Sequence, residues 1–490
     1  MQRDGEPALV PVGHYHGVLY LAEGPSRWVR LGDVSTVRLG EAEHEAWLLA
    51  HEAVPEEQGV RLRTEAELIE AGGNAEALAR LRERGLVDEL PVGPREQAAF
   101  AERYRLVPLA PGLGNEVRGE AGWFGVGLPG RRGHFQGLAG RWLALHTLGY
   151  DLWRSSGAAQ SLAEACAWQV APEAEGAEGA GPVDPALIDL DRLDRPTAVD
   201  QAVRIVAPLI SSWAAAVQPA AESPLVPSEQ RVGSVLPPVE PADPAGALDP
   251  EEILRIPLRD DLPLPAEARE RVTLSIPRWE ADPGHPGAAG WLFAVGHDGG
   301  VLHRVADGVL VGRRVRIGAE DVLLTPEESQ LWQLTATGDP HRLWNRSAVA
   351  AAAVGEGVAD AGRTLAGLIE RGVVVEVHPG TEQARVFAER YRLRPLLHGL
   401  GDKPDDHRLY QIGVPGRRPI SGHGVEERLL WETAGQTPTL WASVELLTGH
   451  LRDLGRRSPG GPDDFLTRRV FTGIRRLIES GTAYLDLAPV

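Results

Sequence analysis

The sequence predicts an α+β fold that is mostly helical and internally duplicated. Its tandem winged-helix-like units each combine a small antiparallel β-meander with three helices. Three observations predict this class. Sequence motifs recur in the same order in the two halves of the 490-residue chain. Short β-branched runs broken by Gly or Asp-Gly precede helix-capping residues and amphipathic stretches. A stretch rich in Pro and acidic residues separates the halves.

The duplication is clearest around one heptapeptide. The segment 100–106, Phe-Ala-Glu-Arg-Tyr-Arg-Leu, recurs unchanged at 387–393, and both copies continue to a Gly-Leu-Gly motif, at 112–114 and 399–401. Because chance would not preserve the order of so many matches, we interpret the pattern as an internal duplication. Further matches are Gly13-His14 with Gly296-His297, Trp47 with Trp332, Arg84-Gly85 with Arg371-Gly372, Pro129-Gly130-Arg131-Arg132 with Pro415-Gly416-Arg417-Arg418, and Trp153 with Trp441.

The pattern divides the chain into four winged-helix-like units and a linker. Units 1 and 3 carry the β-meander, whereas units 2 and 4 begin with the heptapeptide, which bridges to the unit before it. The linker is rich in Pro and acid, and its alternating leucines predict a strand or strap that lies on a folded copy. The expected boundaries are 1–92 for unit 1, 93–218 for unit 2, 219–290 for the linker, 291–379 for unit 3 and 380–490 for unit 4.

The second copy shows the predicted elements most clearly. Thr325 is suited to cap a helix, with Pro326 at its first position and Glu328 as the carboxylate of a capping box. Gly372 then ends a third helix before a Val-rich strand. The expected strands of unit 3 are 291–295, 301–305, 309–311, 315–317 and 373–377, and its later helices are 347–354 and 360–371.

The other three units follow the same order. Unit 1 has strands within 9–39 and a closing strand after Gly85. Helices of unit 1 are expected near 41–52, 63–71 and 74–84, those of unit 2 at 138–147, 153–168 and 199–217, and those of unit 4 at 425–434, 440–454 and 462–480.

Units 1 and 3 resemble the PqqD-like peptide-recognition domains, which hold leader peptides for enzymes that modify ribosomally made peptides. The resemblance covers 12–90 and 295–377, with Trp47 and Trp332 in the first helix and a Glu-Arg-Gly-Leu/Val closing motif as landmarks. It implies peptide binding by strand addition to the exposed edge of the meander, beside a groove next to the third helix.

The repeated heptapeptide predicts a structural joint between the front and back units. Phe100, Tyr104, Phe387 and Tyr391 are expected to pack there, because each copy needs the same connection. A ligand or peptide site formed by the two tyrosines is the alternative.

Clustered arginines are the candidate partner-binding residues. Pro-Gly predicts a tight turn, so each of the two following Arg pairs is expected on a hairpin tip like a wing. These side chains suit either phosphate groups or acidic residues of the other copy or of a partner. The C-terminal arginines suit a solvated helix face or a helix that reads DNA. The candidates are Arg131, Arg132, Arg417, Arg418, Arg468, Arg469, Arg475 and Arg476.

No motif predicts a catalytic residue, a cofactor or a metal site. His14 and His16 would share one side of a strand, but the second copy keeps only His297 of this pair. The Gly-rich stretch 125–130 lacks the ending of a phosphate-binding loop. Cys166 lies in an apolar stretch and is expected to be inert.

Composition limits the compartment and the partner. The formal charge is −19, which disfavours a protein whose main task is to wrap nucleic acid. A lone cysteine, no apolar run long enough for a membrane span and no signal-peptide pattern predict a cytoplasmic protein without membrane partners. Lys403 is the only lysine, a bias typical of high-GC bacterial genomes.

Three functions therefore stay open. The first is a non-catalytic peptide- or protein-binding adaptor of a bacterial biosynthetic system, such as leader-peptide recognition in ribosomal peptide modification. The second is a winged-helix DNA-binding transcriptional regulator. The third is a non-catalytic subunit of an enzyme complex. The expected partner is a peptide or protein rather than nucleic acid, and the oligomeric state is left open.

Overall fold

The computed structural model describes most of the chain outside the linker. The described residues are 6–21, 24–32, 35–56, 59–115, 123–128, 140–169, 194–220, 290–304, 307–337, 345–453 and 466–489. We call 6–220 the first half and 290–489 the second half. The predicted linker strand and the tip with Arg131 and Arg132 lie outside these residues.

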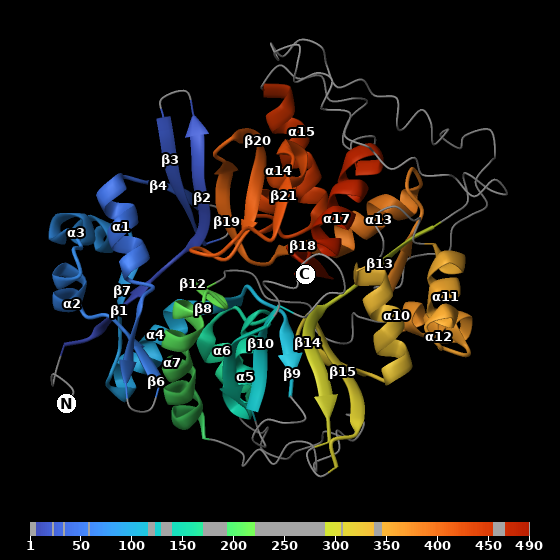
Figure 1. The fold of residues 1–490 in the computed structure, drawn as a ribbon, viewed down its shortest axis with the longest axis horizontal. Coiled ribbons are helices and arrows are strands. Elements are labelled where there is room, and N and C mark those ends of the chain that lie inside the picture. The colour runs from blue at the N-terminus through green and yellow to red at the C-terminus, as the bar shows by residue number, and fades with distance from the viewer. Residues whose placement is uncertain are drawn as a thin grey trace.

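The first half alternates short strands with helices (Figure 1). Its front part contains β1 (Ala8–Pro11), β2 (His14–Leu21), β3 (Gly24–Leu31), β4 (Ser35–Leu39), α1 (Glu41–Leu49), β5 (Ala53–Glu56), β6 (Gly59–Leu62), α2 (Glu65–Glu70), α3 (Ala75–Glu83) and β7 (Val87–Leu90). Its back part contains α4 (Pro94–Arg103), β8 (Tyr104–Pro108), β9 (Gly112–Gly114), β10 (Trp123–Leu128), β11 (Gly140–His146), α5 (Thr147–Ser156), α6 (Leu162–Gln169), α7 (Arg195–Ser211) and β12 (Ala215–Pro219).

The described elements of the second half follow nearly the same order, without a counterpart of the β5–β6 hairpin. Its front part contains β13 (Trp291–Ala294), β14 (His297–His303), β15 (Leu310–Ile317), β16 (Glu320–Leu324), α10 (Pro326–Thr337), α11 (Arg346–Gly355), α12 (Ala361–Glu370) and β17 (Val374–Val377). Its back part contains α13 (Glu382–Arg390), β18 (Tyr391–Pro395), β19 (His398–Lys403), β20 (Asp406–Gly413), β21 (Ser421–His423), α14 (Val425–Ala434), α15 (Leu440–Asp453), the π-helical turn η5 (Leu466–Val470), α17 (Phe471–Glu479) and β22 (Ala483–Leu487).

Each of the two largest sheets is shared between the halves. One six-stranded sheet has the order β21-β20-β19-β2-β3-β4, and the other has the order β11-β10-β9-β14-β15-β16. Figure 1 shows the blue hairpin β2–β3 beside the orange β19–β20, and β9–β10 beside the yellow β14–β15. The front meander of each half therefore completes its sheet with strands from the back part of the other half.

Glycines make these cross-half contacts possible. The contacts β2–β19 and β9–β14 are parallel and very short, and Val18 pairs with Gly401 in the first of them. A Cβ atom on Gly17 would lie 2.1 Å from the backbone nitrogen of Gly401. One on Gly114 would lie 1.7 Å from the carbonyl oxygen of Val301. The repeated Gly-Leu-Gly motif is thus explained by the close approach of two backbones.

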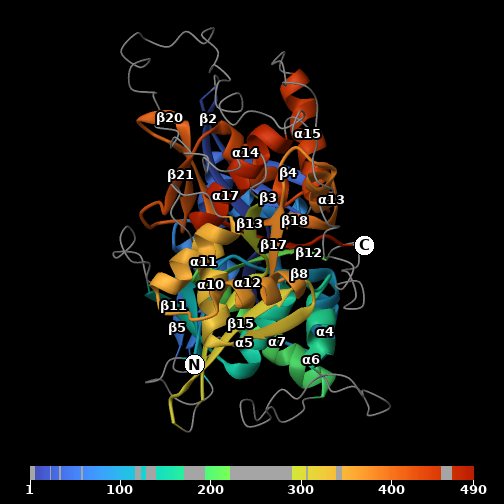
Figure 2. The same ribbon diagram turned by 90° about the vertical axis from the view of Figure 1, so that its right-hand side faces the viewer.

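The cores follow the same exchange. Leu19, on β2, packs in the large core of the second half, whereas Leu302, on β14, packs in the back core of the first half. A separate core fills the front part of the first half, around Trp47. Small two-stranded pairs, including β8–β12 and β18–β22, lie near the middle of the molecule (Figure 2).

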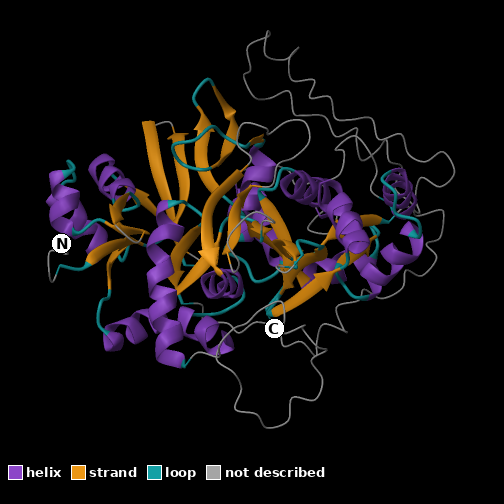
Figure 3. Ribbon diagram, turned by 60° about the horizontal axis from the view of Figure 1, so that its bottom comes forward, coloured by secondary structure: helices purple, strands orange, loops and turns teal. Residues whose placement is uncertain are grey.

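The expectation of a mostly helical fold is wrong. Helix accounts for 42% and strand for 35% of the structure, and the strands are spread over seven small sheets within the described residues. Figure 3 shows helices and strands interleaved through the molecule. Sequence periodicity missed the extra strands because β9, β19 and β21 are short and rich in Gly, so they carry no alternating pattern.

Local signals placed many helices well. α14 begins and ends where the sequence predicted, and the predicted capping box opens α10: Thr325 N–H donates to Glu328 at 2.9 Å, and Glu328 N–H donates to Thr325 Oγ1 at 3.3 Å. The helix expected at 138–147 is wrong, since β11 occupies most of it. In the described part of the chain, no helix has the length and apolar character to cross a bilayer.

Candidate functional site

The predicted joint residues pack within each half, at the turn from helix to strand. Phe100, in the last turn of α4, lies beside Tyr104 on β8, with ring centroids 4.8 Å apart. Phe387, in the last turn of α13, lies beside Tyr391 on β18, with centroids 5.1 Å apart. Phe100, Phe387 and Tyr391 are buried. Tyr104 is half-buried, and its hydroxyl donates to Asp88 Oδ2 at 2.7 Å.

The hairpin-tip arginines that the structure describes are exposed. Arg417 and Arg418 follow β20 in a turn closed by a hydrogen bond from Arg417 N–H to the carbonyl of Val414. The Arg417 guanidinium lies 5.8 Å from the ring centre of Trp142, on β11 of the other half. This contact is a cation–π interaction across the two halves.

The C-terminal arginines lie among acidic residues. Arg468 is in η5, Arg469 lies 3.5 Å from Glu426, and Arg476 pairs with Glu427. Arg475 is buried on α17 and pairs with Glu479 at 2.6 Å. These contacts favour internal ion pairing over a free basic face.

Among the described strands, β4 and β16 each lie at one end of a six-stranded sheet, beside the third helix of their front part, and β21 and β11 lie at the opposite ends. The carbonyl oxygen of Arg38, on β4, accepts a hydrogen bond from Arg84 at 2.6 Å, and that of Leu323, on β16, accepts one from Arg371 at 3.4 Å. These carbonyls point away from the sheet, because alternate residues of an edge strand face outward. The backbone groups of Thr36, two residues before Arg38, and of Asp321, two residues before Leu323, therefore also point away from the sheet.

Two reciprocal joints hold the halves together. At joint 1, His14 of β2 bonds the carbonyl of Leu397 at 2.7 Å, and Tyr410 donates to the carbonyl of His16 at 2.6 Å. At joint 2, His297 bonds the carbonyl of Ala110 at 2.9 Å, and Tyr150 donates to the carbonyl of Gly299. Each joint therefore uses an imidazole and a tyrosine hydroxyl to bind backbone of the opposite half.

Indole hydrogen bonds identify the matching tryptophans. Trp431, on α14, donates to the carbonyl of Thr482 at 2.9 Å, and Trp153, on α5, donates to that of Ala214 at 3.3 Å. The match of Trp153 with Trp441 is therefore wrong. The mismatch arises in the first half: β11 occupies the place of the helix expected at 138–147, so the helix that corresponds to α14 is α5, which carries Trp153.

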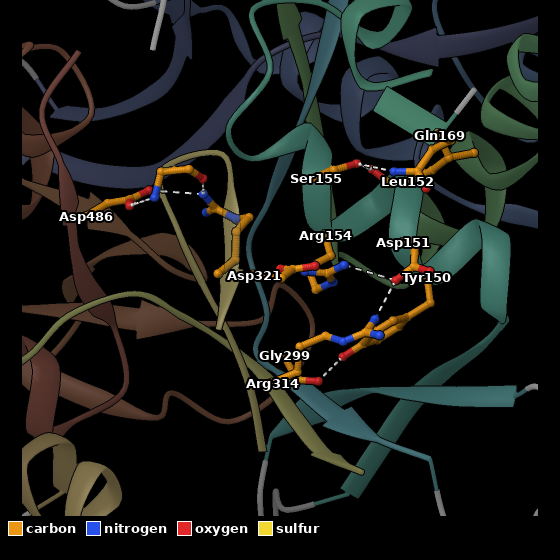
Figure 4. Close-up of polar contacts among 12 residues, drawn as sticks. Tyr150, Asp151, Leu152, Arg154, Ser155, Gln169, Gly299, Arg314, Asp321 and Asp486 are labelled. Carbon is orange, nitrogen blue, oxygen red and sulfur yellow. Dashed lines mark hydrogen bonds and ion pairs between the residues drawn. The ribbon is translucent and has the colours of Figure 1, made fainter. Parts of the chain in front are cut away.

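Joint 2 is rich in ion pairs (Figure 4). The Asp151 carboxylate accepts from Arg154 at 3.1 Å and from Arg314 at 2.8 Å, and Arg154 also pairs with Asp321. Buried Arg316 of β15 lies 3.2 Å from buried Asp486 of β22. Burial alone would raise the pKa of Asp486, but the charges of Arg316 and Arg392 outweigh it and hold that pKa below its usual value.

Joint 1 instead gathers histidines. His14 is centred 5.2 Å from His16 and 5.1 Å from His398, and Trp431 lies beside both His14 and His16. His14 and His16 thus lie together, as the strand pattern predicted. Trp213 stacks on His51 at 4.0 Å and meets His398 edge-on at 4.9 Å.

The hydrogen bonds of His14 define its protonation. Its Nδ1 atom lies 3.0 Å from Nη2 of Arg30, and a guanidinium can only donate. Nδ1 is therefore the acceptor, so Nε2 carries the proton and donates to Leu397. Burial, with Arg30 as the next cause, lowers the pKa of His14 and of His16 well below 6.5, and burial lowers the pKa of His398 to about 3.

Sequence reasoning missed His398, Trp213 and Arg30. The available signal was departure from the repeat rather than agreement with it. His398 stands where the first half has Pro111, and Trp213 stands where the second half has Gly481. Within the described residues no group of three His, Cys, Asp or Glu side chains is arranged to hold a metal ion.

Comparison with known proteins adds no relative. No protein-family model matches the chain, and neither a curated protein nor a solved structure matches it.

Proposed function

We propose that this chain is a non-catalytic adaptor that binds a peptide or protein partner of a bacterial biosynthetic system, in the cytoplasm. The observation that carries the proposal is the pair of outer strands, β4 and β16. Each strand presents backbone N–H and C=O groups that point away from its sheet, and each lies beside a third helix, β4 beside α3 and β16 beside α12. Among the described strands, β4 pairs only with β3 and β16 only with β15. The resemblance of the front units to PqqD-like domains supports a peptide as the partner.

Binding would occur by strand addition. An extended peptide would donate to and accept from the outward groups of Thr36 or of Asp321 and Leu323. Arg84 and Arg371 occupy the last outward carbonyl of each edge, so the added strand would either end there or displace the arginine. Leu323 is 46% exposed and would offer an apolar contact to the added strand.

Proline substitutions on the edges test the proposal. Thr36→Pro and Leu323→Pro remove an outward N–H and leave the bonds to β3 and β15 in place, as edge strands tolerate proline. Thr36→Val and Leu323→Val keep the N–H and serve as matched controls. A random-peptide display selection on the wild-type protein should enrich extended sequences that bind the valine variants and lose at least tenfold in affinity for the proline variants. Enriched peptides that bind both kinds of variant equally would contradict strand addition.

The DNA-binding alternative is tested in parallel. We expect fluorescence anisotropy with duplex DNA to show no tight binding at physiological salt, because the net charge of −19 repels phosphate. Tight binding with a steep salt dependence, of about −0.9 in log K per phosphate contact, would instead support a regulator. Loss of that binding on changing Arg417 and Arg418 to Ala would locate it at the hairpin tip.

A further inference from the structure

Joint 1 is built to hold neutral imidazoles. His14, His16 and His398 are at most 3% exposed, and no side-chain hydrogen bond satisfies Nε2 of His16. Protonation of His14 at Nδ1 would turn its acceptor into a donor that faces the Arg30 guanidinium. The bond between β2 and β3 at this point would then be replaced by repulsion between two cations.

The carboxylates around the cluster already interact with arginines. Arg30 lies against Gly435 at the end of α14, where a Cβ atom would be 1.5 Å from its Nη1 atom, and helix C-terminal carbonyls favour that cation. Asp402 and Glu432 pair with Arg428 at 3.2 and 3.0 Å, and the charge of Arg30 also acts on Glu432. The titratable and charged groups facing the cluster are Tyr15 and Arg30 from the front meander, His44 and His51 from the region of α1, Asp402 from β19, Tyr410 from β20, and Arg428 and Glu432 from α14.

The backbone at joint 1 is also strained. Leu397 and Trp213 have φ of 65° and 61°, and they are the two non-glycine residues with positive φ in the described part of the chain. His14 bonds the carbonyl of Leu397, and His51 and His398 flank the ring of Trp213. The left-handed conformation of Trp213 ends helix α7, because its N–H donates to the carbonyl of Ile210 and the N–H of Ala214 donates to that of Leu209. The histidines therefore contact two strained positions without causing the strain.

Joint 2 lacks these features at the matching positions. The residues of joint 2 that correspond to His16, His398, Trp213 and Leu397 of joint 1 are Gly299, Pro111, Gly481 and Ala110, respectively. Its arginine, Arg316, is paired with Asp486, whereas the matching residue in joint 1 is the uncharged Gln218, on β12. A proton at joint 2 therefore meets one imidazole beside an arginine that is paired with its own carboxylate. A proton at joint 1 meets three imidazoles beside Arg30, where the two carboxylates share Arg428.

We propose that joint 1 is a proton-sensitive latch: uptake of protons by His14, His16 and His398 releases the β2–β3 hairpin from β19 and α14, while joint 2 stays closed. Repulsion between a protonated His398 and a protonated His14 or His16 acts across the contact between the halves, so it favours this release. The sheet β21-β20-β19-β2-β3-β4 then separates at its single parallel contact. Acidification thus changes the contact between halves without unfolding either of them.

Labels at the hairpin tips report the release. The rings of Tyr20 and His407 stack at 4.5 Å across the two halves, and both residues are exposed. In the full chain, Tyr20→Cys and His407→Cys are labelled with pyrene, and excimer emission is followed from pH 7.5 to pH 4 alongside far-ultraviolet circular dichroism. We expect the excimer to disappear with uptake of two or more protons while the helical signal persists.

Single substitutions assign the protons. His16→Leu and His398→Leu should each lower the midpoint pH of the excimer transition. Each should also reduce by about one the number of protons taken up, which the steepness of that transition measures. His297→Leu, at joint 2, is the matched control and should leave midpoint and slope unchanged. A cooperative thermal melt at pH 8, where imidazoles are neutral in both states, verifies that each variant is folded.

Three results would overturn the latch. The first is an unchanged slope in both joint 1 variants. The second is an equal effect of His297→Leu. The third is loss of the helical signal at the same pH as the excimer, which would make the transition global unfolding.

Discussion

Glycine at position 17 is fixed by a backbone contact that the sequence alone does not reveal. Its φ is +82°, and a Cβ atom would overlap the backbone of Gly401. Gly24 has a positive φ of 112° but nothing within 4 Å of its Cβ position. The two positions therefore share backbone strain and differ in steric overlap.

We predict that Gly17→Ala destabilises the protein by about 2–4 kcal/mol, since overpacking adds to the conformational strain. Gly24→Ala should cost about 1 kcal/mol, from strain alone. Denaturant unfolding monitored by tryptophan fluorescence measures both. Equal losses would mean that β2 and β19 do not approach as closely as described.

Tyr391 and Tyr104 occupy matching positions but differ in burial. Tyr391 is fully buried against Phe387, whereas Tyr104 is half-buried. We predict that Tyr391→Ala costs about 3–5 kcal/mol and Tyr104→Ala clearly less. Melting temperatures of the two variants, with Tyr104→Phe as a control for the hydroxyl bond to Asp88, test the difference. Unchanged melting of both would place these rings on the surface.

At the scale of elements, strands β15 and β22 meet through one buried ion pair. Arg316 and Asp486 are 1% and 0% exposed in their side chains, and Asp486 also accepts from the N–H of Gly318 at 2.6 Å. Removal of one partner leaves the other charge buried without compensation.

We predict that Asp486→Ala costs about 3–5 kcal/mol. Gln218→Ala, at the matching position on β12, removes hydrogen bonds but no charge and should cost about 1–3 kcal/mol. Chemical denaturation at pH 7 compares the two variants. A smaller loss for Asp486→Ala than for Gln218→Ala would contradict a stabilising role of the pair.

The same carboxylate contributes to acid sensitivity. Because the pKa of Asp486 is lowered in the folded state, its stabilisation is present above the unfolded value near 3.8 and is lost as pH falls through the folded pKa. Wild-type and Asp486→Asn proteins should therefore differ most near neutral pH and converge in strong acid. Urea midpoints measured between pH 7 and pH 2 give this comparison.

At the scale of the whole molecule, the halves depend on each other for their sheets. Three strands of each six-stranded sheet come from the opposite half, and Leu19 and Leu302 pack in the opposite cores. Many non-covalent contacts therefore connect segments distant in sequence, and we expect these contacts to hold the halves together without a covalent connection.

We predict that the chain stays associated after a protease site inserted between 221 and 289 is cut. The fragments should co-elute in size-exclusion chromatography and separate only in denaturant. Separation of the fragments in native buffer would contradict the shared sheets.

Global stability should also fall in mild acid. The folded pKa values of His51, His297 and His398 are about 3, below the usual 6.5, so the unfolded state binds more protons below pH 6.5. Stability is therefore present above pH 6.5 and is lost as pH falls, by about 1.4 kcal/mol per pH unit for each such imidazole. Unfolding free energies between pH 8 and pH 4.5 measure this slope, and a flat profile would contradict neutral burial.

Local sequence signals predicted those elements whose cause is local. The capping box at Thr325, the apolar spacing of α12 and the glycine stop at Gly372 depend on residues within a few positions. The ring contact between Phe387 and Tyr391 is local in the same way, because the two residues lie one helical turn apart. Candidate arginines were visible in the sequence, but the acidic partners of Arg469 and Arg476 come from another helix, α14.

The sequence by itself determined the repeated order of motifs, the bounds of some helices, such as α14, and the positions of the repeated glycines. Only the tertiary structure decided that the meander of each half pairs with strands of the other half. Strand pairing depends on partners far along the chain, and the short sequences of β9 and β19 have no hydrophobic alternation that would predict a strand. It also decided that His14, His16, His398 and Trp213 form one buried cluster. His14 matches His297, but the positions of His16, His398 and Trp213 break the repeat. Periodicity could therefore not add His398 and Trp213 to the histidine pair, whereas packing of the two halves does.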